Sequence, residues 1–94
     1  MIRSFANPDT ERIWNGERCR KFPPDIHQRA FRKLGMVDAA VNLDDLKNPP
    51  SNGLHDLKRD RLGQHAISIN KKWRICFVWK DEDAHDVEIT DYHD

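Results

Sequence analysis

The sequence predicts an α+β domain in which helices come first and a small, mostly antiparallel β-sheet follows. Three patterns indicate this order: an apolar stripe with helical spacing, a long apolar strand pattern after it, and another strand pattern close to the C-terminus. The 94 residues suit one domain. We therefore expect residues 1–94 to pack two to three helices against one face of a three- or four-stranded sheet.

The N-terminal residues predict a short strand and a short helix. Met1–Phe5 is the expected strand. Asn7 and Pro8 favour a helix over residues 8–14, because Asn caps helix N-termini and Pro suits the first helical position.

The main helix is predicted from its start signal and its apolar spacing. Asp25 follows two prolines and is expected to be the N-cap, with Gln28 as its partner in a capping box. The apolar stripe has a period of about 3.6 residues and consists of Ile26, Ala30, Leu34, Val37 and Val41. Residues 43–46 predict a further helical turn, which Pro49 and Pro50 end.

The second half of the chain predicts strands at 54–57, 64–70, 73–80 and 87–92. The third pattern is the strongest, with Ile75, Phe77 and Trp79 on one face and Arg74, Cys76 and Val78 on the other. We expect these strands to be joined by a basic turn at 58–63, a hairpin turn at 70–72 and an acidic turn at 81–86.

The net charge is zero, but the charges are segregated along the chain. Between His55 and Arg74 there are six basic and two acidic residues, whereas 81–94 holds seven acids and no Lys or Arg. Such segregation can create a local positive field on a neutral protein. Two ordinary solvated loops would show the same pattern, so charge alone leaves nucleic-acid binding open.

Arg74 lies inside an otherwise apolar strand, where an unpaired guanidinium is costly. It is either a structural ion-pair partner of Asp91 or Glu88, or a clamp for phosphate oxygens, which its planar fork suits.

The C-terminal strand carries a second set of candidates, because Asp91, Tyr92 and His93 follow one another on it. A histidine titrates near neutral pH and can transfer protons, although a frayed terminus is the alternative. His55 and Lys58 flank the start of the basic turn.

RNA is the substrate class that needs only these groups. Its 2′-hydroxyl is an internal nucleophile beside the scissile phosphate, so His, Tyr, Lys and Arg suffice without a cofactor. We expect no metal site, because the histidines and the two cysteines lack the spacing of zinc ligands. No signal peptide or membrane span is visible, and we expect a cytoplasmic protein.

These residues resemble the HigB toxins, members of the RelE superfamily of bacterial type II toxin–antitoxin modules. The resemblance rests on LHDLKRDRLGQHAISINKKWRICFVW (54–79) and VEITDYH (87–93), supported by IRSFANPDTERIW, RKLGMVDAA and DDLKNPPSNGL. It implies a RelE-like fold and a ribosome-dependent mRNA endonuclease that inhibits translation. It also implies a HigA-like helix-turn-helix antitoxin, through which the toxin contacts operator DNA indirectly.

The resemblance also assigns roles to residues of this chain. Arg74 matches the phosphate-stabilising arginine, and Asp91, Tyr92 and His93 match the terminal catalytic cluster. His55 and Lys58 match positions of the basic loop, and we expect Lys58 to help Arg74 hold the phosphate. The expected RNA-binding residues are Lys58, Arg59, Arg61, Asn70, Lys71 and Lys72.

Three other functions remain open at this point. A ParE-like toxin, which poisons DNA gyrase, shares the fold and needs no terminal Asp-Tyr-His. A non-catalytic module could bind RNA or a protein partner through the basic loop. A catalytically inactive member could be retained as the partner of an antitoxin.

Overall fold

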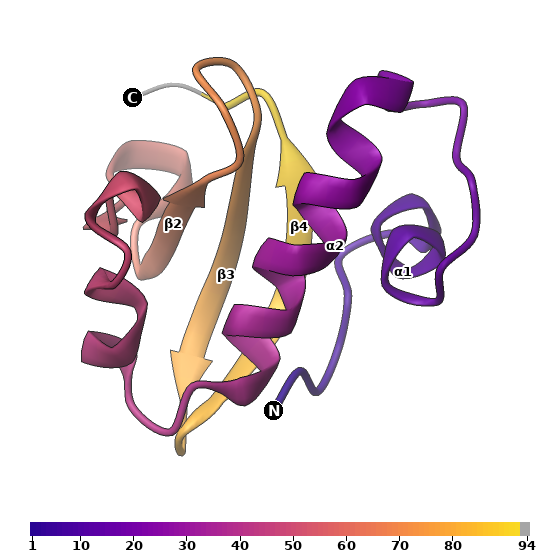
Figure 1. Ribbon diagram of the computed structural model, residues 1–94. Coiled ribbons are helices and arrows are strands. Elements are labelled where there is room, and N and C mark those ends of the chain that lie inside the picture. Colours follow the sequence, from indigo (N-terminus) through magenta and orange to yellow (C-terminus); the bar gives the residue numbers. More distant parts are fainter. Residues whose placement is uncertain (93–94) are drawn as a thin grey trace.

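The structure is a computed structural model that describes residues 1–92 (Figure 1). Its helices are α1 (Pro8–Trp14), α2 (Pro24–Ala39) and the short 3-10 helices η1 (Leu43–Lys47), η2 (Pro50–Asn52) and η3 (Arg59–Arg61). Its strands are β1 (His55–Asp56), β2 (Gln64–Ser68), β3 (Arg74–Lys80) and β4 (Asp83–Thr90). The strands form one antiparallel sheet in the order β1-β2-β3-β4, which confirms the predicted fold class.

Helix α2 lies across one face of this sheet and forms the main core with it (Figure 1). The buried side chains of this core include Ile26, Ala30, Leu34 and Val37 of the helix and Ile67, Ile75, Phe77 and Ile89 of the strands. Successive side chains of a strand point to opposite faces. Burial of Ile75 and Phe77 under α2 therefore turns Arg74 and Cys76 to the other side, as predicted.

We call the side of the sheet opposite α2 the back face. Strand register defines two adjacent rows of residues on it: Ser68, Arg74 and Thr90 form one, and His55, Ala66, Cys76 and Glu88 form the other. A small apolar cluster on this face consists of Leu57, Ala66 and Cys76, with Tyr92 packed against it.

The predicted start and end of α2 were wrong in detail. The helix begins at Pro24 with Pro23 at the N-cap position, and no side chain caps it, so Asp25 is not the N-cap. The helix ends at Ala39, because Ala40 takes up extended backbone. Val41 consequently leaves the apolar stripe and is 64% exposed.

The two terminal strands also differ from the prediction. Residues 1–5 form no strand, although Ile2 and Phe5 make isolated parallel bridges with β4. The acidic segment is mostly strand, since β4 begins at Asp83. Its register shifts opposite Cys76 and Val78, and Asp86 has a φ of 52°. This bulge breaks the alternation of apolar residues that would have revealed the first half of the strand.

The first helix and the turns agree with the prediction more closely. Helix α1 spans Pro8–Trp14, and the Asn7 side chain caps it by accepting a 2.9 Å hydrogen bond from the Thr10 amide. Helix η1 supplies the predicted turn after α2. None of the helices in residues 1–92 has the length and apolarity that crossing a membrane requires.

A buried polar pair ties α2 to the segment before β1. Lys33 Nζ donates a 2.5 Å hydrogen bond to Asn52 Oδ1, and both side chains are buried. Asn52 Nδ2 in turn donates to the carbonyl oxygens of Leu46 and Asn48 at 3.1 and 3.2 Å. One buried amide therefore holds η1 and η2 against the helix.

Replacing Asn52 with alanine should lower the free energy of unfolding by about 2–3 kcal/mol, because a buried ammonium and two carbonyl groups lose their partner. Urea denaturation followed by circular dichroism measures this difference. The control Ser51→Ala removes an exposed neighbouring side chain and should change stability by less than about 0.5 kcal/mol. An Asn52→Ala protein as stable as its parent would show that the pair does not hold this layer.

Candidate functional site

Arg74 begins β3 at the end of the sheet near the β2–β3 hairpin. Its half-buried side chain lies on the back face, where Nη1 donates a 3.2 Å hydrogen bond to Ser68 Oγ. Within residues 1–92, Arg74 forms no ion pair with a carboxylate. Since a guanidinium has five N–H donors, most of them are available to a ligand such as a phosphate.

The structural partner predicted for Arg74 belongs to another arginine. Arg61 Nη1 lies 2.9 Å from Glu88 Oε1 and also donates to Gln64 Oε1 at 3.1 Å. Burial alone would lower the pKa of Arg61, but the hydrogen bond and the charge of Glu88 outweigh it and raise this pKa above its usual value. Arg61 thus fastens the basic turn to β4.

Tyr92 fastens the same turn from the end of the described chain. Its ring packs on the apolar cluster of the back face, and the Arg61 guanidinium lies 5.0 Å from the ring centroid. Its hydroxyl donates to the Lys58 carbonyl oxygen over 3.4 Å. Tyr92 therefore contacts the basic turn directly.

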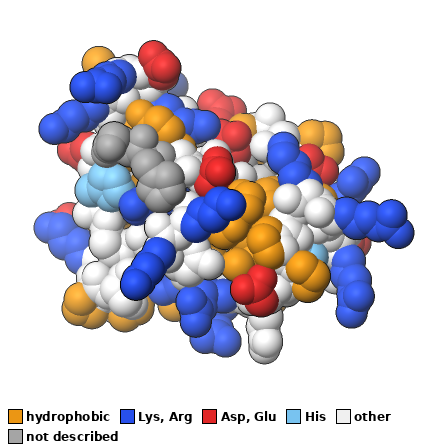
Figure 2. All heavy atoms as spheres, turned by 90° about the horizontal axis from the view of Figure 1, so that it is seen from above, with side chains coloured by type: hydrophobic (Ala, Val, Ile, Leu, Met, Phe, Trp, Pro, Cys, Tyr) orange, Lys and Arg blue, Asp and Glu red, His pale blue; other side chains and the backbone are white. Residues whose placement is uncertain are grey.

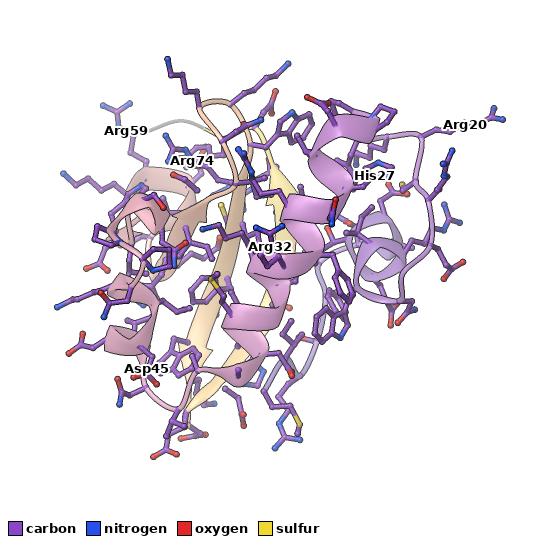
Figure 3. The ribbon with its side chains drawn as sticks, in the orientation of Figure 1. Arg20, His27, Arg32, Asp45, Arg59 and Arg74 are labelled. Carbon is purple, nitrogen blue, oxygen red and sulfur yellow. The ribbon has the colours of Figure 1, made fainter. Side chains whose placement is uncertain are left out.

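The other predicted residues of the basic turn surround this contact. Lys58 and Arg59 are exposed, and Figure 3 shows Arg59 and Arg74 at the same end of the molecule. His55 is half-buried in the back-face row next to that of Arg74. Its Nδ1 lies 2.9 Å from the Gly53 carbonyl oxygen, so this nitrogen carries the proton and donates.

The predicted hairpin turn contributes shape as well as charge. Asn70 Oδ1 accepts hydrogen bonds from the amides of Lys72 and Trp73 at 2.8 and 2.7 Å, which closes the turn. Lys71 and Lys72 are exposed at its tip. Figure 2 looks down on this end of the molecule and shows Lys and Arg side chains spread around a hydrophobic patch.

The structure thus places Arg74 and His55 in adjacent rows of the back face, with Tyr92 packed on the apolar cluster of that face and in contact with the Lys58 backbone. Asp91 is exposed next to Tyr92, whereas His93 lies outside the described residues. Sequence reasoning missed Ser68 as the partner of Arg74. The signal was present, because a hairpin turn at 70–72 pairs residue 68 with residue 74.

Metal chemistry has no evident ligand set in the described part of the chain. Within residues 1–92, His, Cys, Asp and Glu side chains form no group of three that could hold a metal ion. The back face instead carries a guanidinium, an imidazole and a phenol, and an exposed ammonium lies on the turn that the phenol contacts. Such groups bind phosphate oxygens and transfer protons.

Comparisons with known proteins give one consistent result. Residues 3–93 match the profile of a family described as RelE-like toxin of type II toxin-antitoxin system HigB. "Toxin HigB-1" of Vibrio cholerae serotype O1 is 38% identical over 82 residues, which cover 86% of each chain. "Endoribonuclease HigB" of Proteus vulgaris is 30% identical over 93 residues, which cover 99% of this chain and 100% of that protein.

The fold has solved counterparts as well. The toxin–antitoxin complex "YoeB-YefM complex from Staphylococcus aureus" contains a chain that matches with a TM-score of 0.61. The match covers 100% of this chain and 99% of that chain, at 13% sequence identity. At this identity the likeness concerns the fold alone.

Replacing Arg61 with alanine should loosen the turn at 58–63, because Glu88 and Tyr92 lose the cation that joins them. Amide hydrogen exchange of this turn should accelerate, and the free energy of unfolding should fall by about 1–3 kcal/mol. The matched control Arg59→Ala removes an exposed arginine of the same turn and should leave both quantities unchanged. Equal exchange in the two variants would contradict the fastening role of Arg61.

Proposed function

Because the chain belongs to the HigB family of RelE-like toxins of type II toxin–antitoxin systems, we propose that it is an endoribonuclease that cleaves mRNA. The reaction class comes from a relative that carries the name Endoribonuclease HigB. The observation in this structure that best supports the proposal is Arg74, a half-buried guanidinium without a carboxylate partner within residues 1–92, on the same face of the sheet as the apolar cluster against which Tyr92 packs.

The reaction we propose uses the substrate's own nucleophile. A base removes the proton of the 2′-hydroxyl, the 2′-oxygen attacks phosphorus, and the bond to the 5′-oxygen breaks as that oxygen takes up a proton. The products are a 2′,3′-cyclic phosphate and a 5′-hydroxyl. The protein must stabilise the extra negative charge on the phosphorane and supply two proton transfers.

We assign the charge-stabilising part to Arg74 and Lys58. Arg74 can bind two phosphate oxygens at once, and the hydrogen bond to Ser68 restrains its fork. Lys58 is exposed on the turn whose backbone Tyr92 contacts, so its ammonium can reach a phosphate on the back face. Preorganised cations of this kind stabilise charge that develops in the transition state.

We assign the proton transfers to the histidines and the C-terminal residues. His93, which lies outside the described residues, is the candidate proton-transfer group, and Asp91, two residues before it in the sequence, would orient it. Tyr92 offers an aromatic ring for stacking on an unpaired base, the usual way in which single-stranded RNA is held. His55, in the row beside that of Arg74, is the other candidate imidazole.

The partners we propose follow the family. A HigA-like helix-turn-helix antitoxin would neutralise the toxin and connect it to operator DNA, and translated mRNA on the ribosome in the cytoplasm would be the substrate. The exposed cations of the turn and the hairpin support binding to a polyanion: Lys58, Arg59, Lys71 and Lys72. Cleavage of the same mRNA with and without ribosomes tests the ribosome requirement.

Replacing Arg74 with alanine should reduce cleavage about 100- to 1,000-fold, because the phosphorane loses its main cation. Arg74→Lys should recover only part of the rate, since an ammonium lacks the planar fork. Primer extension on translated mRNA measures the cut sites, and the far-ultraviolet spectrum checks folding. The control Arg12→Ala, at an exposed position of α1, should cleave like the parent. Full activity of folded Arg74→Ala would refute the assignment.

Replacing His93 with alanine should reduce the cleavage rate about 100-fold or more while the protein keeps its fold, because one proton transfer loses the imidazole that performs it. Growth arrest on induction reads out toxicity, and translation and DNA supercoiling are followed in the same cells. An inhibited gyrase with ongoing translation would indicate a ParE-like activity instead. A His93→Ala protein as toxic as the parent would remove His93 from the mechanism.

A further inference from the structure

A second basic feature lies outside the back face, between α2 and the β2–β3 hairpin. Here a groove of about 610 Å³ is lined by four cations, Arg29, Arg32, Lys33 and Lys71. No carboxylate is among the described residues that line it. The sequence pattern did not distinguish the three cations of α2, because their spacing is that of the polar side of an amphipathic helix.

The charges of this groove are not neutralised by the protein. Within residues 1–92, none of the four cations forms an ion pair. Arg29 lies three and four residues before Arg32 and Lys33, a spacing at which like charges destabilise a helix. Burial, and then the charges of Arg29 and Arg32, lower the pKa of Lys33. A bound anion would offset this repulsion.

The groove adjoins the site around Arg74 at one residue, Ser68. Ser68 lines the groove, and its Oγ accepts the hydrogen bond of Arg74. Arg29 Nη1 donates to the Ile69 carbonyl oxygen over 3.3 Å, which fixes α2 against the root of the hairpin. A ligand held by Arg74 can therefore extend past Ser68 to the cations of the groove. Figure 3 labels Arg32 on α2 and Arg74 at the adjoining end of the sheet.

We propose that this groove binds backbone phosphates of the RNA on one side of the bond cleaved at Arg74, with Arg32 and Lys71 as its exposed contacts. The proposal rests on the proposed function, because it takes RNA as the polymer held at Arg74. A polyanion with evenly spaced charges suits a row of cations that starts at the phosphate clamp, and Arg forks bind phosphate oxygens in pairs.

The test uses an RNA that cannot be cleaved, so that binding is measured apart from catalysis. The probe is a fluorescent single-stranded oligonucleotide with every 2′-hydroxyl methylated, titrated with the full chain at several salt concentrations. The double variant Arg32→Gln/Lys71→Gln should bind at least about tenfold more weakly. The slope of log K against log salt should become shallower by about 0.7 for each cation removed.

The matched control is Arg18→Gln/Arg20→Gln, which removes the same charge from exposed arginines of another surface. Figure 3 shows Arg20 on the side of the molecule away from Arg74. This control should bind the probe like the parent. An equal loss of probe binding in both double variants would show that only net charge matters, and it would overturn the proposal. Unchanged probe binding by Arg32→Gln/Lys71→Gln would overturn it as well.

Two further measurements distinguish this proposal from the proposed function and from binding of the antitoxin in the groove. If the parent cleaves no RNA but the groove variant still loses probe binding with its salt slope, the proposed function fails and the groove assignment stands. If the groove variant loses binding to the antitoxin while probe binding is unchanged, the groove accepts an acidic peptide and the proposal is wrong.

Discussion

The site depends on one packing constraint, the burial of Ile75 and Phe77 between the sheet and α2. Because the side chains of a strand alternate, this burial leaves Arg74 no choice but the back face. A shift of β3 by one residue would expose the core and bury a guanidinium, which is far too costly to be populated. The same core that stabilises the domain therefore also orients its main candidate for phosphate binding.

Cations of one sequence segment have different surroundings in this fold. Arg61 is paired with Glu88 and stacked near Tyr92, so most of its field is cancelled and its role is to hold the turn. Arg74 has a serine hydroxyl as its partner, which fixes its position without cancelling its charge. The number of basic residues in the segment consequently overstates the positive field that a phosphate would meet there.

The neutral net charge is compatible with a locally positive surface because acids such as Asp83 and Asp45 make their contacts elsewhere in the fold. Asp83 pairs with Arg3, whose hydrogen bond lowers the pKa of that carboxyl. The pKa of Asp45 is lowered because its carboxylate accepts hydrogen bonds from the backbone amides of Asn42 and Val41. Lys71 and Lys72 at the hairpin, in contrast, have no ion-pair partner within residues 1–92.

The sequence by itself determined the fold class, the helix at 8–14, the two faces of β3 and the hairpin turn, because each follows from local periodicity or turn chemistry. It did not locate the start of β4, where a bulge hides the alternation, or the end of α2. Only the tertiary structure decided which arginine Glu88 neutralises, and that Ser68 joins Arg74 to a groove on α2. These contacts join elements that are separate in the sequence. They depend on how α2 and the turn at 58–63 pack against the sheet, and no local sequence pattern encodes that packing.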